Sequence, residues 1–144
     1  MILPDVNVLL IAHREELSGH ERMAGWLTEI VNGDEAYGMS DLVLSGFLRV
    51  ATNPRVFDPP TPLDSALEFV GAVRDRPNRV AVDPGPRHWR IFTRLCEEAG
   101  ARADLVPDAY LAAMAIESGA EWVSTDRDFA RFPGLRWRDP RQSS

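Results

Sequence analysis

Two aspartates lie close together in the stretch VSTDRDFARF, residues 123–132, directly after a short apolar run. Asp126 and Asp128 suit a polar turn, because Asp is a common turn residue and helix N-cap. The same carboxylates could instead bind a divalent metal ion if other acids reach this place from elsewhere in the chain. On its own, the stretch favours the turn.

Other acids do follow elements that end near such a place. Asp5 comes directly after the β-like run 1–4, and Asp108 comes just after Pro107, near the start of the alanine-rich segment DAYLAAMAIESG. In a parallel α/β sheet, ligands bind outside the carboxyl ends of the strands. We therefore expect Asp5, Asp108, Asp126 and Asp128 to meet at one edge of a sheet.

Carboxylates that meet in this way need a partner. Two of them about 5 Å apart at an effective dielectric constant of about 20 repel by about 3 kcal/mol. A divalent cation removes this repulsion, and oxygen ligands suit Mg²⁺ or Mn²⁺, whereas Zn²⁺ sites usually contain Cys or His. His13, His20 and His88 are scattered without paired spacing, so we interpret them as surface or packing residues.

The elements that must position these acids alternate along the chain. Short β-like runs occur at residues 1–4, 35–39, 79–82, 121–124 and, less regularly, 135–137. Helical spacing of apolar residues occurs at 23–31, 61–70 and 92–99, with Gly100 as a C-cap. This alternation predicts an α/β fold with a mostly parallel sheet and helices on both faces.

Two further helical segments are apolar nearly all round, namely 41–51 (DLVLSGFLRVA) and 108–119 (DAYLAAMAIESG). Such a composition predicts central helices that are buried on more than one side. We expect the second helix to begin at Pro107, because proline favours the first helical position.

Composition limits the class of protein. The chain of 144 residues, 44% apolar and 26% charged, predicts one domain over residues 1–140 and a frayed tail over 141–144. No apolar run approaches the ~18 residues of a membrane span and no signal segment begins the chain, so we expect a cytoplasmic protein. A net charge of −6 argues against a protein that coats nucleic acid, though not against a nuclease. The single cysteine, Cys96, excludes an internal disulfide.

The segments LPDVNVLL and PDAYLAAMAIESGAEWVSTDRDFARFPGLRW resemble PIN-domain proteins, most closely the VapC-type ribonuclease toxins of bacterial toxin–antitoxin pairs. The resemblance runs from Asp5 through SGFLRVATNPRVF to FPGLRW. It implies a three-layer α/β/α fold and a metal-dependent endoribonuclease with Mg²⁺ or Mn²⁺ in an acidic pocket. It also implies an RNA substrate, a cognate antitoxin and a homodimer.

The resemblance also implies roles for individual residues. Asp5, Asp108 and Asp126 match the catalytic acids of the family, and with Asp128 they make up the expected metal ligands. Asn7 and Thr125 match polar positions that lie beside the acids and orient the metal ligands or water. For Arg49, a position near a phosphate or the acids and a place at the helix edge with its charge in solvent are equally open.

One position departs from the family. Where the family commonly has Glu, this chain has Gly46, so the pocket has one negative charge fewer. Asp41 lies five residues earlier, which is the wrong helical rotation for a substitute. Asp104 would share a face with Asp108 only if that helix began before Pro107, which we do not expect. Weakened catalysis is therefore open, and the alternative function is a PIN-fold module that binds RNA or a protein partner.

Overall fold

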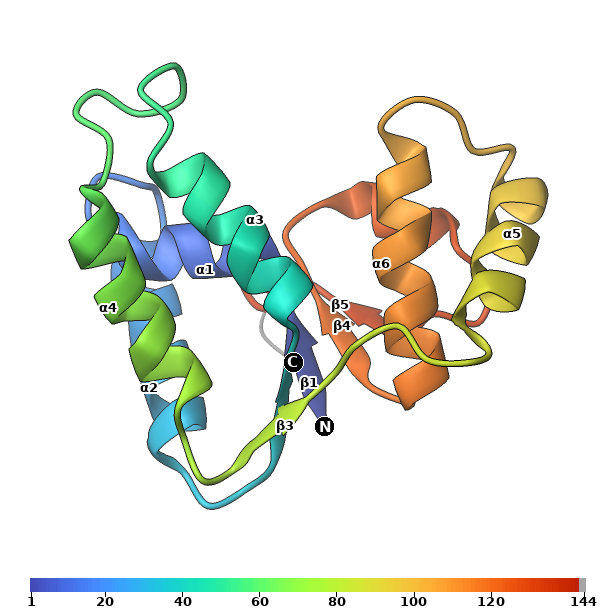
Figure 1. Cartoon of the computed structure of the whole chain (residues 1–144), viewed down its shortest axis with the longest axis horizontal. Helices are drawn as coiled ribbons and strands as arrows, with labels where there is room; N and C mark the ends of the chain where they lie inside the picture. The colour runs from blue at the N-terminus through green and yellow to red at the C-terminus, as the bar shows by residue number, and fades with distance from the viewer. Residues whose placement is uncertain (143–144) are drawn as a thin grey trace.

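The structure is a computed structural model in which residues 1–142 are described (Figure 1). The described strands are β1 (Ile2–Pro4), β2 (Tyr37–Met39), β3 (Arg79–Ala81), β4 (Glu121–Val123) and β5 (Trp137–Arg138). The helices are α1 (Val6–His13), α2 (His20–Asn32), α3 (Asp41–Ala51), α4 (Leu63–Arg74), α5 (His88–Ala99) and α6 (Leu105–Ser118). A short 3₁₀ helix, η1 (Arg127–Arg131), follows β4.

The strands pair in parallel, as the alternation of elements predicts. β4 lies between β1 and β5, β2 pairs with β3, and β2 packs beside β1. In Figure 1, α1 to α4 gather on one side of the strands and α5 and α6 on the other. The expected α/β/α arrangement with a parallel sheet is therefore confirmed.

The register of the first and fourth strands places two chain segments side by side. Pro4 pairs with Val123, and the N–H of Asp5 donates to the carbonyl of Val123 at 2.9 Å. The residues that follow each strand, Asp5 and Ser124, therefore meet at the carboxyl edge of the sheet. This is where the sequence predicts that the acids meet.

The two helices expected to be central differ from each other. α6 is buried along Ala109, Ala112, Ala113, Met114 and Ala115, so it packs on several sides. α3 buries one face only and leaves Leu42 43% exposed. The prediction for α3 was wrong, because an apolar residue at a surface position is common and does not by itself indicate burial.

Two helix starts also differ from expectation. α1 was not predicted, because its apolar residues follow β1 after a single residue and resemble a continued strand. α6 begins at Leu105 rather than at Pro107. Pro107 lies in the first turn, where its missing N–H has no intrahelical partner to lose, so the helix extends upstream of it.

The C-terminal segment packs against the domain as far as it is described. Asp139 is 5% exposed, and Arg141 binds it through two nitrogen atoms. Fraying of the tail 141–144 stays a prediction, and residues 143–144 lie outside the described residues. Within residues 1–142, no helix has the length and apolarity needed to cross a membrane.

Candidate metal centre

Asp5 stands between β1 and α1 and is fixed by hydrogen bonds on both carboxylate oxygens. As the N-cap of α1 it accepts from the N–H of Val6 at 2.7 Å through Oδ1. Its Oδ2 accepts from the hydroxyl of Ser124 at 2.7 Å and from the Asn7 side-chain amide at 3.2 Å. With 7% exposure, Asp5 is a buried acid whose direction is set by its neighbours.

Ser124 and Asn7 extend this network to the segment after β4. The Ser124 hydroxyl also accepts from the Asn7 amide at 3.1 Å and from the N–H of Asp126 at 3.1 Å. The Asn7 side-chain oxygen accepts from the N–H of Thr125 at 3.2 Å. These bonds tie the first acid to the loop that carries the next two.

Asp126 and Asp128 lie on that loop. Asp126 is the N-cap of η1, and its Oδ1 accepts from the N–H of Asp128 at 2.9 Å. Phe129, 1% exposed, packs on Trp122 and anchors η1 to the core. The turn predicted from the sequence and the acid cluster are therefore the same structure.

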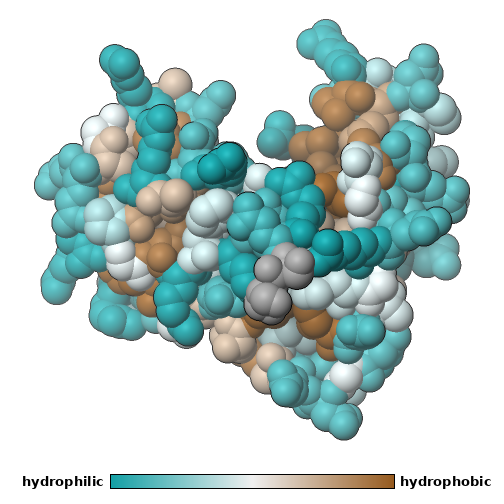
Figure 2. All heavy atoms as spheres, turned by 180° about the vertical axis from the view of Figure 1, so that it is seen from behind, coloured by the Kyte–Doolittle hydropathy of each residue, from teal (hydrophilic) through white to brown (hydrophobic). Residues whose placement is uncertain are grey.

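Asp108 reaches the same place from the first turn of α6. Oxygen atoms of Asp108, Asp126 and Asp128 all lie within 4.8 Å of one another. Figure 2 shows a notch between two lobes at the top of the molecule, and in Figure 1 α6 begins at this end. Asp128 is exposed and Asp108 and Asp126 are partly exposed, so a ligand can reach the cluster from solvent.

The proximity of these acids changes their titration. Burial, together with the charges of Asp126, Asp5 and Asp128, raises the pKa of Asp108 to about 6. Burial also raises the pKa of Asp5, while its hydrogen bond from Ser124 opposes this rise. The site therefore holds excess negative charge that a cation would relieve.

The donor set fits a divalent cation that prefers oxygen. Carboxylate oxygens at these separations suit Mg²⁺ or Mn²⁺. His13, His20 and His88 bind Thr61, the Ile11 carbonyl and the Tyr110 carbonyl instead. They act as packing residues, as expected from their scattered positions.

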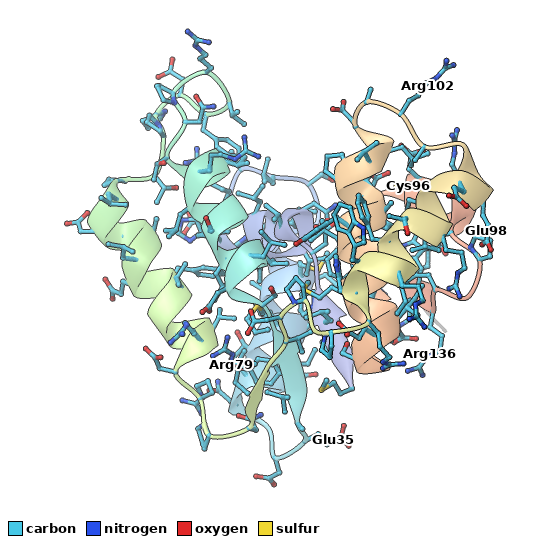
Figure 3. All side chains as sticks on the ribbon, turned by 45° about the vertical axis from the view of Figure 1, so that its right-hand side comes forward. Glu35, Arg79, Cys96, Glu98, Arg102 and Arg136 are labelled. Atoms are coloured by element: carbon cyan, nitrogen blue, oxygen red, sulfur yellow. The ribbon has the colours of Figure 1, made fainter. Side chains whose placement is uncertain are left out.

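Asp104 and Asp41 lie outside the cluster. Asp104 is the exposed residue that precedes α6, and its charge is the weakest of the four that raise the pKa of Asp108. Figure 3 shows Arg102, on the same loop, pointing away from the molecule. Asp41 pairs with Arg74 at 2.8 Å and with Arg79 at 3.2 Å, so its carboxylate is already compensated.

Gly46, at the position where the resemblance implies Glu, faces α1. A Cβ atom at this position would lie 3.0 Å from Cγ2 of Val6, so the glycine permits the close packing of α3 on α1. Beside it, a groove of about 350 Å³ runs between α3 and α6. The groove is lined mostly by apolar residues, with Ser45 and one cation, Arg49; the other lining residues are Val6, Leu42, Val43, Gly46, Pro107, Tyr110 and Leu111.

Ser124 belongs to the hydrogen-bond network of the site, although the sequence did not predict it. Its hydroxyl makes three contacts within the network, whereas the contact of Thr125 is made by its backbone N–H. The sequence did contain a signal for this residue: a small hydroxyl side chain that directly follows a strand, two positions before an acid. Asn7 lies beside Asp5, as expected, and Arg49 lies in the groove next to Gly46.

The whole chain is also similar to known proteins. Residues 2–135 match the family model described as PIN domain. VapC ribonuclease Mb2897 of Mycobacterium bovis is 46% identical over 140 residues, which cover 97% of this chain and 95% of that protein. Ribonuclease VapC25 of Mycobacterium tuberculosis is 44% identical over 136 residues, with 94% and 96% covered.

The fold is also similar to solved structures. One of these, a toxin–antitoxin complex from Klebsiella pneumoniae, has a chain that aligns with a TM-score of 0.65 at 16% sequence identity. The alignment covers 97% of this chain and 98% of that one.

Proposed function

We propose that this chain, which belongs to the PIN-domain family, is a metal-dependent endoribonuclease and the toxin of a toxin–antitoxin pair. The names of the relatives support the reaction, since two of them are called ribonucleases at 46% and 44% identity over nearly the whole chain. The proposed substrate is RNA, and the proposed reaction is hydrolysis of its phosphodiester bonds. A toxin of this kind limits growth.

The observation that carries the proposal is the acid cluster. Three carboxylates from two separate elements have oxygen atoms within 4.8 Å of one another, and one of them has a pKa raised to about 6. Such repulsion costs stability and has no structural benefit in the chain by itself. A bound cation would remove the repulsion, and this relief would strengthen its binding.

We propose that Asp108, Asp126 and Asp128 hold Mg²⁺ or Mn²⁺, with Asp5 beside them. When bound, the ion would supply positive charge against the scissile phosphate and would make a water molecule more acidic. Asp5 cannot rotate freely, because Val6, Ser124 and Asn7 all donate to it. Its role is to present one fixed carboxylate edge to the site.

Asp108 is proposed to orient the attacking water as well as to hold the ion. Without a bound cation its pKa is raised to about 6, so at pH 7.5 the carboxyl group is mostly ionised and can accept a hydrogen bond from water. Ser124 and Asn7 hold the loop of Asp126 in place, so the acids keep their separation while a substrate phosphate binds. Thr125 contributes its backbone N–H to this framework.

The groove between α3 and α6 is the proposed docking site of the antitoxin. Val6 and Pro107 line the groove and immediately neighbour Asp5 and Asp108, so a peptide bound there would reach the acids. Its apolar walls suit apolar side chains, and the acids suit a basic one that competes with the metal ion.

We also propose that the protein is cytoplasmic and forms a homodimer. A monomer mass in light scattering at micromolar concentration would contradict the dimer.

The test is cleavage of a mixed, structured RNA pool by purified protein with Mg²⁺ or Mn²⁺. We expect discrete cuts that disappear with EDTA and in Asp5→Asn. Asp104→Asn is the matched control, because Asp104 lies one helical turn from Asp108 and outside the cluster, and it should cut normally. Equal activity in EDTA would exclude metal dependence.

Gly46 supports a second candidate function. Without the usual Glu of the family, the chain would be a module that binds RNA or a protein partner without cutting. A folded, antitoxin-free protein that binds RNA but leaves the whole pool intact would favour this candidate. Discrete metal-dependent cuts would exclude it.

A further inference from the structure

The C-terminal segment lies behind the loop that carries Asp126. The indole N–H of Trp137 donates to the carbonyl of Ser124 at 3.0 Å. One guanidinium nitrogen of Arg141 donates to the carbonyl of Thr125 at 3.3 Å. The backbone carbonyl of Arg138 accepts from the N–H of Ser124 at 3.1 Å. The two residues before Asp126 are thus held by residues 137–141.

Arg141 is itself fixed by a buried acid. Asp139, 5% exposed, accepts from Nε of Arg141 at 3.1 Å through Oδ1 and from a terminal nitrogen at 2.7 Å through Oδ2. The Oδ1 atom also accepts from the N–H of Arg141 at 2.9 Å. This two-point contact fixes the guanidinium plane, and the terminal nitrogen that binds Asp139, Nη2, also donates to the carbonyl of Thr125.

The loop is therefore held from two sides. On the side of the acid cluster, Asn7 binds the N–H of Thr125 and Ser124 binds the N–H of Asp126. On the other side, Trp137 and Arg141 bind the carbonyls of Ser124 and Thr125. Fixing donors and acceptors of the same peptide groups leaves the loop little freedom to rotate, so the direction of the Asp126 carboxylate is set by both sides.

We propose that Trp137 and Arg141 are positioning residues of the acid cluster, which act by holding the Ser124 and Thr125 carbonyls. The metal-binding part of this inference rests on the proposed function. Both residues follow residue 135, where the match to the family model ends. The support for the loop thus comes from residues outside the match to the family model.

The experiment compares Arg141→Gln and Trp137→Phe with Arg138→Gln. The Arg138 side chain binds Glu121 at 3.0 Å, at the opposite end of β4. The substitution therefore removes an arginine side chain of the same segment that does not touch the loop, and it leaves the backbone bond from Ser124 in place. Hydrogen exchange of the Thr125, Asp126 and Asp128 amides reports loop order. Calorimetric titration with Mn²⁺ reports the acid cluster without any RNA.

We expect the loop amides to exchange about tenfold faster in Arg141→Gln, while amides inside α6 keep their rates. Mn²⁺ affinity should fall about tenfold, the low end for loss of a group that orients a ligand. Trp137→Phe should change both readouts in the same direction, and Arg138→Gln should change neither. Arg141→Lys keeps the charge beside Asp139 but lacks the planar fork, so it should not restore loop protection.

Three outcomes would overturn the inference. The first is unchanged loop exchange in Arg141→Gln and Trp137→Phe. The second is faster exchange with unchanged Mn²⁺ affinity, and the third is full recovery in Arg141→Lys, which would reduce the role of Arg141 to charge. If the unmodified protein binds no Mn²⁺, the proposed function fails, and loop exchange alone then decides whether the C-terminal segment positions the loop.

Discussion

Asp41 and Asp108 occupy comparable places in the chain, since each lies in the first turn of a helix. Asp41 accepts hydrogen bonds from Arg74 and Arg79, and the bond from Arg74 holds its pKa below the ordinary value. Asp108 faces other acids instead, and burial and their charges raise its pKa to about 6. Figure 3 shows Arg79 on the β3 side of the molecule.

The two acids differ in whether nearby side chains neutralise their negative charge. Around Asp41 the chain provides the cations itself, so the acid links α3, α4 and β3. Around Asp108 it brings up further carboxylates. Perturbed pKa values of this kind cluster at functional sites, because they are kept at a cost in stability.

The largest expected difference between the two acid sites is in RNA cleavage. Asp126→Asn should lower the rate at least about 100-fold, because loss of a ligand should cost no less than loss of a group that orients one. Asp41→Asn should retain nearly the full rate. The measurement is initial cleavage rate with Mn²⁺, and similar losses in both variants would remove the distinction between the sites.

The next largest effect is stabilisation by metal. At a Mn²⁺ concentration of 100 Kd, binding adds about 2.7 kcal/mol to the free energy of unfolding, which is about 8 °C in melting temperature for a chain of this size. Asp41→Asn should show the same shift, and Asp108→Asn should show little of it. Thermal melting with and without Mn²⁺ measures both. An equal shift in Asp108→Asn would exclude this residue as a ligand.

A smaller effect concerns pH in the absence of metal. The pKa of Asp108 rises from its ordinary value of 3.8 to about 6 in the folded chain. The folded chain therefore binds this proton more tightly than the unfolded chain does. The stability that this proton contributes is complete below pH 3.8 and is lost as the pH rises through about 6.

Asp108→Asn should therefore reduce the fall in melting temperature over that pH range. In EDTA at pH 7.5 it should melt about 3 °C higher than the unmodified chain, a value reduced because solvent screens a half-exposed group. Melting curves from pH 4 to 8 test this. A lower melting temperature for Asp108→Asn at pH 7.5 would contradict the repulsion.

The smallest effect belongs to the compensated site. Asp41 is exposed, and its ion pairs with Arg74 and Arg79 are accessible to solvent and salt. Asp41→Asn should lower the melting temperature by about 2 °C or less at low salt, and by less still in 0.5 M salt. A loss as large as the Mn²⁺ effect would show that the chain depends on both acid sites to a similar degree.

The sequence predicted the elements better than their ends. The strands lie within two residues of the predicted runs, and α3 coincides with residues 41–51. Gly100 has the left-handed φ of 58° expected of a helix C-cap. The start of α6 was displaced by two residues, because proline is compatible with any position of a first turn and so does not fix where the helix begins.

The candidate site was also predicted only in part. The sequence alone indicated that Asp5, Asp108, Asp126 and Asp128 follow strands or begin a helix, since acid types and local periodicity can be read directly. Only the tertiary structure decided that Ser124 joins Asp5 to Asp126, that Arg141 reaches Thr125, and that Asp41 is neutralised while Asp108 is not. These contacts join residues that are up to 119 positions apart. Their energies depend on distance and burial, which strand register and helix packing set and which no local pattern contains.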